Sequence, residues 1–373
     1  MSVPGARSAL PPMDVSARAD RLRDRFDDAD VDALLVTRLP NIAYLTGFTG
    51  SAGMLLVAPG ELVFVTDGRY AEQSAEQLGA AGVPARIEVR VTQAAQRDAV
   101  SEAAGDYARL GLEAHGVTWA QQRAFASEWF PDAELVATEH LVEDLRRVKE
   151  AAEVARIRTA CAIADEALAV VVPRLTERAT EQEVALALEL EMRARGASGT
   201  SFDTIVASGP NSVKPHARPT PRRIGRGETI VVDFGCVVDG YCSDMTRTFS
   251  VGDPGPDASR VYDVVRTAQR RGRDAVIAGA GCAQVDKACR DVIDAAGWGD
   301  AFVHGTGHGV GLEIHEAPRV AATARDTLDA GYVVTVEPGV YLPGTGGVRI
   351  EDTVAVTDEG TEVLTGFPKD FVL

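Results

Sequence analysis

Apolar positions repeat with two different periods over the first 140 residues of the chain. Helical spacing is found at residues 16–29 and 68–78, and further short helices are indicated near residues 41–48 and 118–129. Between them lie short apolar runs of the length expected for strands, at residues 32–37, 53–59, 61–67, 85–91 and 109–114. A Pro-Gly turn separates the second of these runs from the third. This alternation predicts an α/β domain of modest size.

A long helical pattern follows at residues 139–175 and is expected to break near Pro173, because proline removes a backbone donor and disfavours the helix interior. The next helix is predicted to begin with a capping box formed by Thr180 and Glu183. It is expected to stop at Gly196, since glycine is the usual residue just beyond a helix C-terminus.

Beyond this point strand patterns predominate, with two helices predicted near residues 257–280 and 282–296. A chain of 373 residues is too long for one ordinary hydrophobic core and suits two domains. We therefore predict a flexible tail at residues 1–15, an α/β domain at residues 16–140 and a second, strand-rich domain at residues 141–373.

Charge and composition exclude several classes of protein. A net charge of -17 argues against nucleic acid as a partner, because phosphate binding depends on clustered Lys and Arg. No window approaches the roughly 18 consecutive apolar residues of a membrane span, and the N-terminus lacks the apolar core of a secretory signal. The five cysteines are an odd number without CxxC spacing, which favours buried thiols over disulfides or a zinc ribbon. We therefore expect a cytoplasmic protein.

Two aspartates are predicted to converge on one face of a β-hairpin. In "ETIVVDFGCVVDGYCSDMTRTFSVG", two apolar runs flank Asp239-Gly240, a strong signal for a two-residue hairpin loop. In this register Gly235 faces Asp244 and leaves room above the backbone, which favours a site there. Asp233 is the diagonal neighbour of Asp244, with Cα atoms roughly 7–8 Å apart. Two converging carboxylates repel, so a positive group is expected between them. The alternative is a solvent-facing hairpin with two unrelated acids.

The C-terminal part of the sequence adds two more acids. Glu337 ends an apolar strand and precedes a Pro-Gly pair. In "GVRIEDTVAV" the two-residue period places Arg349 and Glu351 on one face of a strand, with Ile350 and Asp352 on the other. A buried Arg beside a buried Glu can also be a simple ion pair, which in isolation is the favoured interpretation.

Residues 302–318, "FVHGTGHGVGLEIHEAP", contain three of the six histidines in a segment too glycine-rich for a regular helix. With Asp233, Asp244, Glu337 and Glu351, one or more of these histidines would form an oxygen-rich site for two divalent ions such as Mn, Co or Zn. Two such ions polarise a carbonyl and supply a nucleophile for hydrolysis of a peptide or phosphate bond. The sequence has no HExxH or P-loop motif, and its glycines miss the GxGxxG spacing.

The sequence suggests different roles for the six histidines. His115 and His140 are most simply surface or packed residues. His216 lies in a loop stiffened by three nearby prolines, so it is better positioned than most loop residues. The three histidines of residues 302–318 cannot all be ligands if four acids already surround two ions. At least one is therefore available for proton transfer or for stabilising an oxyanion.

These residues resemble the metal-binding set of the pita-bread metallopeptidases, which include methionine aminopeptidase, Xaa-Pro aminopeptidase and Xaa-Pro dipeptidase (prolidase). The family's ligands are Asp, Asp, His, Glu and Glu in chain order. The matching contexts are "VVDFG" at Asp233, "YCSDMTRTF" at Asp244, "GTGHGVGLEIHE" at His308, "VEPGVY" at Glu337 and "RIEDT" at Glu351. The resemblance implies an α+β pita-bread fold for the second domain. It also implies two metal ions, with manganese expected and cobalt or zinc as alternatives.

The resemblance assigns each ligand a role. Asp244 and Glu351 would bridge both metals. Asp233 would hold one metal, and His308 with Glu337 would hold the other.

The resemblance also assigns catalytic and substrate-binding residues. Glu337 would act as a proton shuttle, and His315 would stabilise the tetrahedral intermediate. His216 is both a catalytic and a substrate-site candidate. The further residues expected to line the substrate site are His304, Tyr341 and Arg349.

The N-terminal domain resembles that of the proline-specific branch of the family. Residues 41–73, "NIAYLTGFTGSAGMLLVAPGELVFVTDGRYAEQ", resemble the signature of a creatinase-type N-terminal domain. Residues 145–168 resemble the helix that opens the catalytic domain. Methionine aminopeptidases lack the N-terminal domain, and creatinase lacks the metal ligands that are all present here.

We therefore expect a two-metal exopeptidase that removes an N-terminal residue preceding proline. The motifs "TGFTGSAG" and "TDGRY" favour an Xaa-Pro aminopeptidase, and the alternative is an Xaa-Pro dipeptidase. Two other interpretations are a non-catalytic peptide-binding scaffold of the same fold and hydrolysis of another substrate, such as an organophosphate ester. The expected partners are a proline-containing peptide and, by resemblance, a second copy of the chain in a homodimer. Neither nucleic acid nor a membrane is expected.

Overall fold

The computed structural model describes residues 9–176 and 178–373. They form two compact units, one of residues 12–146 and one of residues 147–373 with residues 9–11. We call these the N-terminal unit and the C-terminal unit. The predicted boundary, between residues 140 and 141, lies at the start of α6 (Leu141–Arg147), whereas the units divide before the last residue of that helix.

The N-terminal unit is an α/β domain built on one mixed sheet. Within residues 12–146 the strand order is β4-β3-β2-β1-β5-β6, antiparallel along β1-β2-β3 and parallel elsewhere. The strands are β1 (Ala33–Val36), β2 (Met54–Ala58), β3 (Glu61–Thr66), β4 (Arg86–Val89), β5 (Arg109–Glu113) and β6 (Glu134–Thr138). Besides α6, the helices are α1 (Arg18–Arg23), α2 (Leu39–Thr46), α3 (Ala71–Ala80), α4 (Gln93–Ala104) and α5 (Trp119–Ala124), with short helical turns at Gly68–Tyr70 and Phe125–Trp129. All predicted elements of this unit are present, and α4 and β6 lie where none was predicted.

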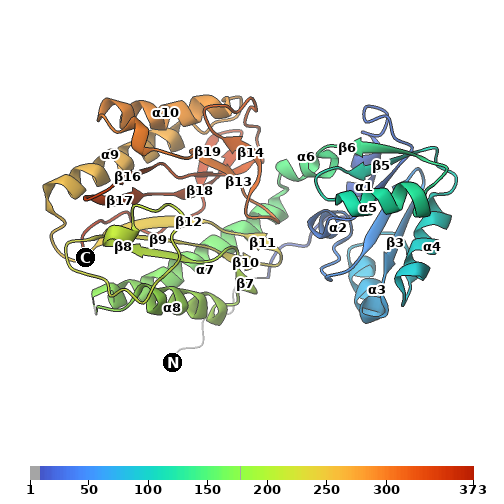
Figure 1. Cartoon of the computed structure of the whole chain (residues 1–373), viewed down its shortest axis with the longest axis horizontal. Helices are drawn as coiled ribbons and strands as arrows, with labels where there is room; N and C mark the ends of the chain where they lie inside the picture. Colours follow the sequence, from blue (N-terminus) through green and yellow to red (C-terminus); the bar gives the residue numbers. More distant parts are fainter. Residues whose placement is uncertain (1–8, 177) are drawn as a thin grey trace. The chain divides into compact units, whose positions relative to one another are not determined.

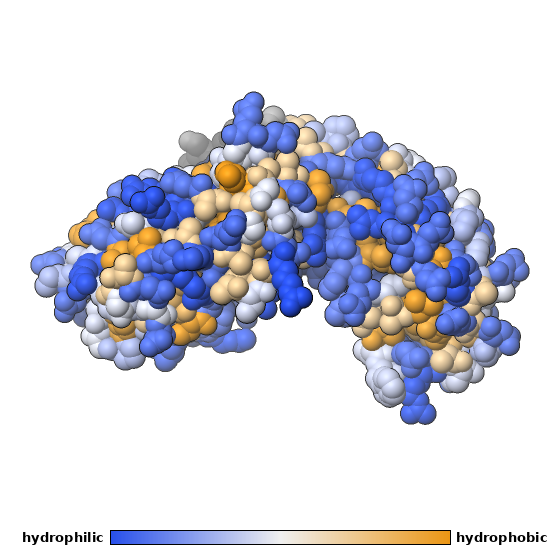
Figure 2. Space-filling view, turned by 90° about the horizontal axis from the view of Figure 1, so that it is seen from above, coloured by the Kyte–Doolittle hydropathy of each residue, from blue (hydrophilic) through white to orange (hydrophobic). Residues whose placement is uncertain are grey.

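All five cysteines are buried and none forms a disulfide, as predicted. In the part of the chain that the structure describes, no helix is long and apolar enough to cross a membrane. The face of the molecule in Figure 2 is mostly hydrophilic, with apolar residues in scattered groups.

The C-terminal unit has two halves, each with a pair of helices against antiparallel strands (Figure 1). In the first half the helices pack on the strands through a core that includes Ile163, Leu188, Val232 and Phe234. The helices are α7 (Ala151–Thr176) and α8 (Glu181–Ala194), and a short helical turn lies at Gly209–Asn211. The strands are β7 (Gly199–Thr200), β8 (Ile205–Ser208), β9 (Thr229–Phe234), β10 (Cys236–Val238), β11 (Tyr241–Cys242) and β12 (Met245–Ser250).

The second half repeats this plan with α9 (Gly255–Asp274) and α10 (Cys282–Ala295) over a core that includes Val265, Val285, Val334 and Val354. Its strands are β13 (Gly307–Gly309), β14 (Glu316–Val320), β15 (Val333–Val336), β16 (Gly339–Leu342), β17 (Gly346–Arg349), β18 (Asp352–Thr357) and β19 (Gly360–Val363), and a short turn lies at Gly299–Ala301. In Figure 1 the two helix pairs lie on opposite sides of the strands. The halves meet where the backbone N–H of Glu351 donates to the carbonyl of Thr246 at 3.1 Å.

The helix predicted over residues 139–175 is interrupted at residues 148–150, between α6 and α7. Hydrogen bonds explain the interruption. The N–H of Lys149 donates to a carbonyl of the second half at 2.8 Å, and the N–H of Glu150 donates to the carboxylate of Glu153 at 2.9 Å. The second bond caps the first turn of a new helix, which charge and apolar spacing alone do not reveal.

The predicted break at Pro173 is wrong, because α7 continues to Thr176. Pro173 lies close to the helix end, so few backbone bonds depend on it. Val171 and Leu175 are both 1% exposed within the core of the first half, and their packing holds the last turn in helical form.

Part of the segment predicted to be a flexible tail is fixed by contacts. Residues 1–8 lie outside the described residues, and residues 9–15 contain no helix or strand. Leu10 packs against the core of the first half, and the carbonyl of Pro11 accepts a hydrogen bond from Arg156 at 2.9 Å.

Candidate metal centre

The predicted hairpin loop joins β10 to β11, and β9 and β12 continue the same pairing, with Asp233 in β9 and Asp244 directly before β12. Asp239 and Gly240 have φ values of 49° and 85°, as a two-residue type I′ loop requires. Asp233 pairs with Thr246, which is the partner that this loop position predicts. The predicted register is therefore confirmed.

Gly235 allows two neighbouring strands to approach closely. A Cβ atom there would lie 1.9 Å from the carbonyl oxygen of Ser243 and 2.3 Å from Ser201 Oγ. The sequence suggested that this glycine leaves room for a site. Instead, the missing side chain leaves room for the neighbouring backbone. Any other residue would push apart the strands that position Asp233 and Asp244.

The glycine-rich stretch contains β13 and the start of β14, and its other residues belong to no helix or strand. β13 pairs with β14 on one side and with β15 on the other. A Cβ at Gly307 would lie 2.0 Å from the carbonyl oxygen of Thr335, and one at Gly309 would lie 2.3 Å from that of Ala317. The glycines therefore let β13 fit between two close backbones, and this placement carries His308 to the acids.

Four acids and His308 meet in the layer of strands between the two helix pairs. They come from different elements: Asp233 and Asp244 from the hairpin, Glu337 from the end of β15, and Glu351 from between β17 and β18. His308 Nε2 lies 3.6 Å from Asp244 Oδ2 and 3.4 Å from Glu337 Oε1. Asp244, His308 and Glu351 each offer one ligand atom, and these three atoms lie within 4.8 Å of one another. We call the five residues the acid cluster.

Burial makes Asp244, Glu337 and Glu351 hard to ionise. Burial, and then repulsion from neighbouring carboxylates, raises the pKa of Asp244 well above its ordinary value. The pKa of Glu351 is raised by burial and then by Glu337 and Asp233. Burial raises the pKa of Glu337 to about 8, against the opposing effect of Arg349. The cluster can therefore carry its full negative charge at neutral pH only beside a cation.

His308 and two oxygens have the properties of metal ligands. Burial, and then charge on His315, lowers the pKa of His308 to about 4, so its imidazole is neutral and has a free lone pair at neutral pH. Within residues 9–176 and 178–373, Asp233 Oδ1 and Glu351 Oε1 are buried carboxylate oxygens without a hydrogen-bond partner. A buried carboxylate oxygen without a hydrogen-bond partner lowers the free energy of unfolding. Four carboxylates and one imidazole fit a pair of hard or borderline divalent cations.

Arg349 pairs with Asp233, and not with the Glu351 that a simple ion pair on one strand face would give it. Its Nη2 donates to Asp233 Oδ2 at 2.5 Å and its Nε to Thr246 Oγ1 at 3.2 Å. Thr246 in turn donates to Glu351 Oε2 at 2.7 Å. Thr246 thus links the Arg349 and Glu351 that the sequence placed on one face. The prediction did not single out Thr246, although it lies two residues after Asp244 and so shares its face.

His304, Tyr341 and Arg349 form a hydrogen-bonded row beside the acid cluster. Arg349 Nη1 donates to the Tyr341 hydroxyl at 2.8 Å, and His304 Nε2 lies 2.9 Å from the same oxygen. Burial lowers the pKa of His304 to about 4 and raises the pKa of Tyr341 to about 12. Both side chains are therefore neutral at neutral pH.

His315 and His216 are exposed residues near the acid cluster. The His315 ring packs edge-on against His308 with 4.3 Å between the ring centroids. Burial, and then charge on His216, lowers the pKa of His315, so the two rings are close enough to interact. Arg349 Nη1 donates to the carbonyl of Pro215 at 3.1 Å and so ties the His216 loop to the row.

His115 and His140 lie in the N-terminal unit and are not part of this arrangement. Both are exposed, and their rings stack on each other with 4.4 Å between centroids. This agrees with their interpretation as surface residues.

Glu181 holds the loop that carries His216, and the sequence prediction missed it. This acid is fully buried, and its carboxylate accepts hydrogen bonds from backbone or side-chain groups of Ser208, Asn211 and Thr220. In the sequence Glu181 is an ordinary acid in the first turn of a helix. Nothing local distinguishes it, because its partners come from a distant loop.

Lys149 holds the segment that carries His315 and was also missed. Its side chain is 1% exposed and pairs with Glu316 at 2.9 Å. Glu316 also accepts a hydrogen bond from the N–H of Glu313 at 3.0 Å, which closes the turn that contains His315. In the sequence Lys149 is one charge among many in a helical pattern, so it carries no signal of burial.

We expect the metal-free protein to lose stability as the pH rises from about 7 to about 9. Glu337 has a folded pKa of about 8 against an ordinary 4.5. The stability associated with its protonated form is present below the lower value and is lost as the pH rises through the upper one. His304 and His308, whose folded pKa is about 4, add no slope in this range. Thermal unfolding at several pH values, with and without Mn²⁺, measures the effect, and bound Mn²⁺ should remove most of the decline.

The control is metal-free Glu337→Gln, which should show a flatter profile because the amide does not titrate. A metal-free wild-type protein whose Tm stays constant or rises over this pH range would show that the carboxylates are not held in a destabilised, charged state.

The sequence and the structure are similar to known peptidases over nearly the whole chain. Residues 155–358 match the model of metallopeptidase family M24, and residues 18–148 match that of the creatinase/prolidase N-terminal domain. The sequence is 34% identical to the Xaa-Pro dipeptidase of Pyrococcus furiosus, over 93% of this chain and 97% of that one.

Two solved structures show the same similarity. An Xaa-Pro dipeptidase from Bacillus anthracis has a TM-score of 0.91 and 40% identity, over 95% of this chain and 99% of that one. An X-Pro aminopeptidase from Thermotoga maritima has a TM-score of 0.85 and 33% identity, over 95% of this chain and 100% of that one.

Proposed function

Because the chain belongs to metallopeptidase family M24 and has a creatinase/prolidase N-terminal domain, we propose that it hydrolyses Xaa-Pro dipeptides with two divalent metal ions. The observation that carries the proposal is the buried acid cluster, in which two carboxylate oxygens lack a hydrogen-bond partner among the described residues. Two of the similar proteins above are Xaa-Pro dipeptidases. They support a dipeptidase over the aminopeptidase that the sequence motifs favoured. Membership of a metallopeptidase family removes the reason to consider a non-catalytic scaffold.

The acid cluster would hold the two ions in the arrangement that the family resemblance implies. Asp244 and Glu351 would contact both ions, Asp233 would contact one, and His308 with Glu337 would contact the other. When bound, two divalent cations polarise the scissile carbonyl and provide a nucleophile that is active at neutral pH. We expect manganese, with cobalt or zinc as alternatives, because a carboxylate-rich site accepts all three.

Glu337 would transfer a proton during the reaction, and His315 would stabilise the negative charge that develops on the substrate. Glu337 is the residue that we assign to proton transfer, as the family resemblance implies, and its Oε1 lies 3.4 Å from His308 Nε2 within the acid cluster. His315 is exposed beside His308, where it can donate a hydrogen bond to the reacting carbonyl oxygen as negative charge develops.

The two neutral rings of the row beside the acid cluster, those of His304 and Tyr341, would form the proline pocket. A bond that precedes proline has no N–H on its nitrogen, so recognition must use the ring instead. The rings of His304 and Tyr341 lie with centroids 5.6 Å apart and are both neutral, which suits contact with an apolar ring. His216 is exposed nearby and is the residue that we assign to the free carboxylate of a dipeptide.

We expect Ala-Pro to be hydrolysed with a kcat/KM about 10- to 100-fold higher than Ala-Pro-Ala, because the longer peptide loses one charge-assisted hydrogen bond to its carboxylate. Both peptides, with Ala-Pro-Ala-Ala, are assayed on enzyme loaded separately with Mn, Co or Zn. Ala-Ala is the control for the requirement for proline. This series also identifies the metal that supports the highest activity.

The second candidate is an Xaa-Pro aminopeptidase, which the similarity to the Thermotoga maritima enzyme supports. Equal or faster cleavage of the longer peptides would favour this activity and would overturn the assignment of His216 to a carboxylate. Equal cleavage of Ala-Ala and Ala-Pro would instead overturn the proline pocket.

The oligomeric state and the cellular location are also proposals. We propose a homodimer on the basis of the family resemblance, and sedimentation measurements on the purified chain test it. We propose a cytoplasmic location because the five cysteines are buried and form no disulfide, which suits a reducing compartment.

A further inference from the structure

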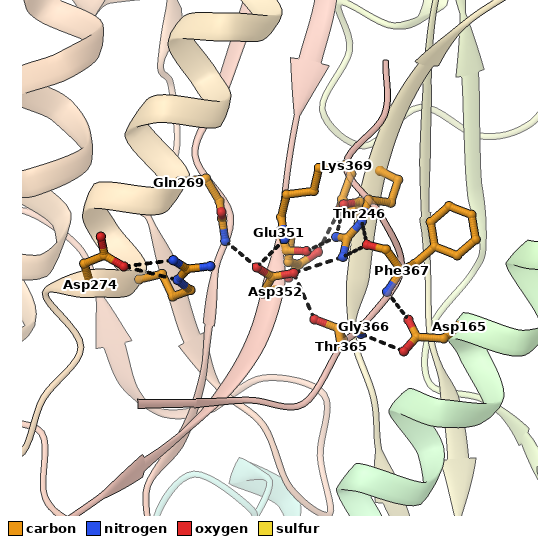
Figure 3. Close-up of polar contacts among 12 residues, drawn as sticks. Asp165, Thr246, Gln269, Asp274, Glu351, Asp352, Thr365, Gly366, Phe367 and Lys369 are labelled. Carbon is orange, nitrogen blue, oxygen red and sulfur yellow. Dashed lines mark hydrogen bonds and ion pairs between the residues drawn. The ribbon is translucent and has the colours of Figure 1, made fainter. Parts of the chain in front are cut away.

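A buried polar network surrounds Asp352, the residue that follows Glu351 (Figure 3). Its centre is the ion pair of Arg247 and Asp352, whose side chains are 1% and 0% exposed and lie 3.0 Å apart. Arg247 follows Thr246, and Asp352 follows Glu351. Successive side chains of extended chain point in opposite directions, so the network lies directly behind the two residues that face the cluster.

Arg247 joins the two backbone segments that carry Thr246 and Glu351. Its Nη1 donates to the carbonyl oxygen of Thr246 at 3.0 Å and to that of Glu351. Its Nε and Nη2 donate to the carbonyl oxygen of Phe367 at 2.9 and 2.8 Å. One guanidinium therefore links β12, the segment between β17 and β18, and the C-terminal segment.

Asp352 is held by more groups than Arg247 alone. Its carboxylate accepts hydrogen bonds from three further side chains at 2.8 to 3.0 Å: Gln269, Thr365 and Lys369 (Figure 3). Gln269 belongs to α9, whereas the other two belong to the C-terminal segment after β19. Groups from several elements thus fix the position of the Asp352 carboxylate. Because Arg247 pairs with this carboxylate, they also fix the position of the guanidinium.

The C-terminal segment is fastened to the first half as well. Asp165 of α7 accepts hydrogen bonds from the N–H groups of Gly366 and Phe367 at 2.6 and 3.0 Å (Figure 3). The carbonyl of Phe367 points the other way, to Arg247. Residues 365–369 therefore connect the helices of both halves to the back of the acid cluster.

We propose that Arg247 and Asp352, fastened by residues 365–369, position Glu351 as a metal ligand, a role that rests on the metal centre proposed above. Thr246 Oγ1 donates a hydrogen bond to Glu351 Oε2. The other carboxylate oxygen, Glu351 Oε1, has no hydrogen-bond partner within the described residues. Because Arg247 bonds the carbonyls of both residues, it holds their two backbones at the separation that the side-chain contact requires. The network thus fixes the direction of the unpaired oxygen before a metal binds.

The test is Mn²⁺ binding to the metal-depleted full-length protein, measured by calorimetry. Arg247→Lys keeps the charge but cannot donate to all of these acceptors at once. Lys369→Met removes one donor to Asp352 and leaves Arg247 in place. The matched control is Arg158→Gln, which removes an ion pair of 2.7 Å between Arg158 and Glu362, from α7 to β19, without contact to Asp352.

We expect Arg247→Lys to weaken one of the two Mn²⁺ sites by about 10- to 100-fold, the usual effect of changing a residue that supports a ligand. Lys369→Met should weaken it less, and Arg158→Gln should bind Mn²⁺ like the wild type. For Arg247→Lys, kcat should recover at saturating Mn²⁺ with KM unchanged, because the ligand itself is still present.

The proposal is overturned if Arg247→Lys and Lys369→Met unfold at lower temperature yet bind Mn²⁺ with wild-type affinity, since the network would then support only the fold. If Arg247→Lys does not fold, Lys369→Met decides by the same criterion, because its side chain is 23% exposed and Asp352 keeps its other donors. Glu351→Gln tests the metal centre separately. If that variant keeps both ions at wild-type affinity, the metal centre is refuted, whatever the network does.

Discussion

Asp244→Asn is expected to abolish peptide hydrolysis and to leave the fold intact. The change removes a carboxylate whose Oδ2 lies 3.6 Å from His308 Nε2, at the point where ligands from both halves meet. The loss of activity should be larger than roughly 10- to 100-fold, which is the effect of changing a residue that only supports a ligand. The reason is that Asp244 would contact both ions. Activity on Ala-Pro and the number of bound Mn²⁺ ions per chain measure it.

The stability of the same variant provides the control. Burial and repulsion from other carboxylates raise the pKa of Asp244, so removing its charge relieves an unfavourable interaction in the metal-free protein. Metal-free Asp244→Asn should therefore unfold at a temperature equal to or above that of the metal-free wild type near pH 8. Mn²⁺ should raise the Tm of the wild type much more than that of the variant. Full activity with two bound ions would refute the ligand assignment.

His315→Ala is expected to lower kcat by roughly 10²–10⁴-fold with metal content unchanged. His315 touches the cluster only through its ring contact with His308 and lies on the exposed side, where a substrate carbonyl would approach. Removing the ring should therefore destabilise the transition state and leave the affinity for metal unchanged. Steady-state kinetics on Ala-Pro and metal analysis of the same preparation measure the two effects.

His315→Gln separates a hydrogen-bonding role from a proton-transfer role, because the amide can donate a hydrogen bond but does not titrate near neutral pH. Partial recovery of kcat in this variant is expected if the ring stabilises developing charge. Loss of one metal ion in His315→Ala would instead identify His315 as a ligand and would remove His308 from its assigned place.

The local sequence was sufficient for most of the elements, though not for α4 or β6, and for the turn that places the aspartates. The φ values of Asp239 and Gly240 and the pairing of Asp233 with Thr246 follow from a two-residue loop and a two-residue period. The capping box of Thr180 and Glu183 was predicted in the same way. These features depend on neighbours in the chain, so a few residues encode them.

The sequence predicted the roles of glycines and buried charges less well. Their roles depend on contacts with parts of the chain that are distant in the sequence. Gly235 was expected to leave room for a site, but it is required by the close approach of Ser243 and Ser201. Lys149 and Glu181 carried no signal as buried residues, since each is one charge in a helical pattern until a distant loop folds over it.

The sequence by itself determined which residues of this protein can bind metal and on which faces of their strands they lie, because side-chain chemistry and the period of a strand are local properties. Only the tertiary structure decided which charges are partners. It paired Arg349 with Asp233, placed Thr246 between Arg349 and Glu351, and put Arg247 and Asp352 behind Glu351. These choices depend on how two halves of the chain pack against each other. Burial in that packed interior raises the pKa of Asp244, Glu337 and Glu351, and it leaves two carboxylate oxygens of the cluster without a partner among the described residues.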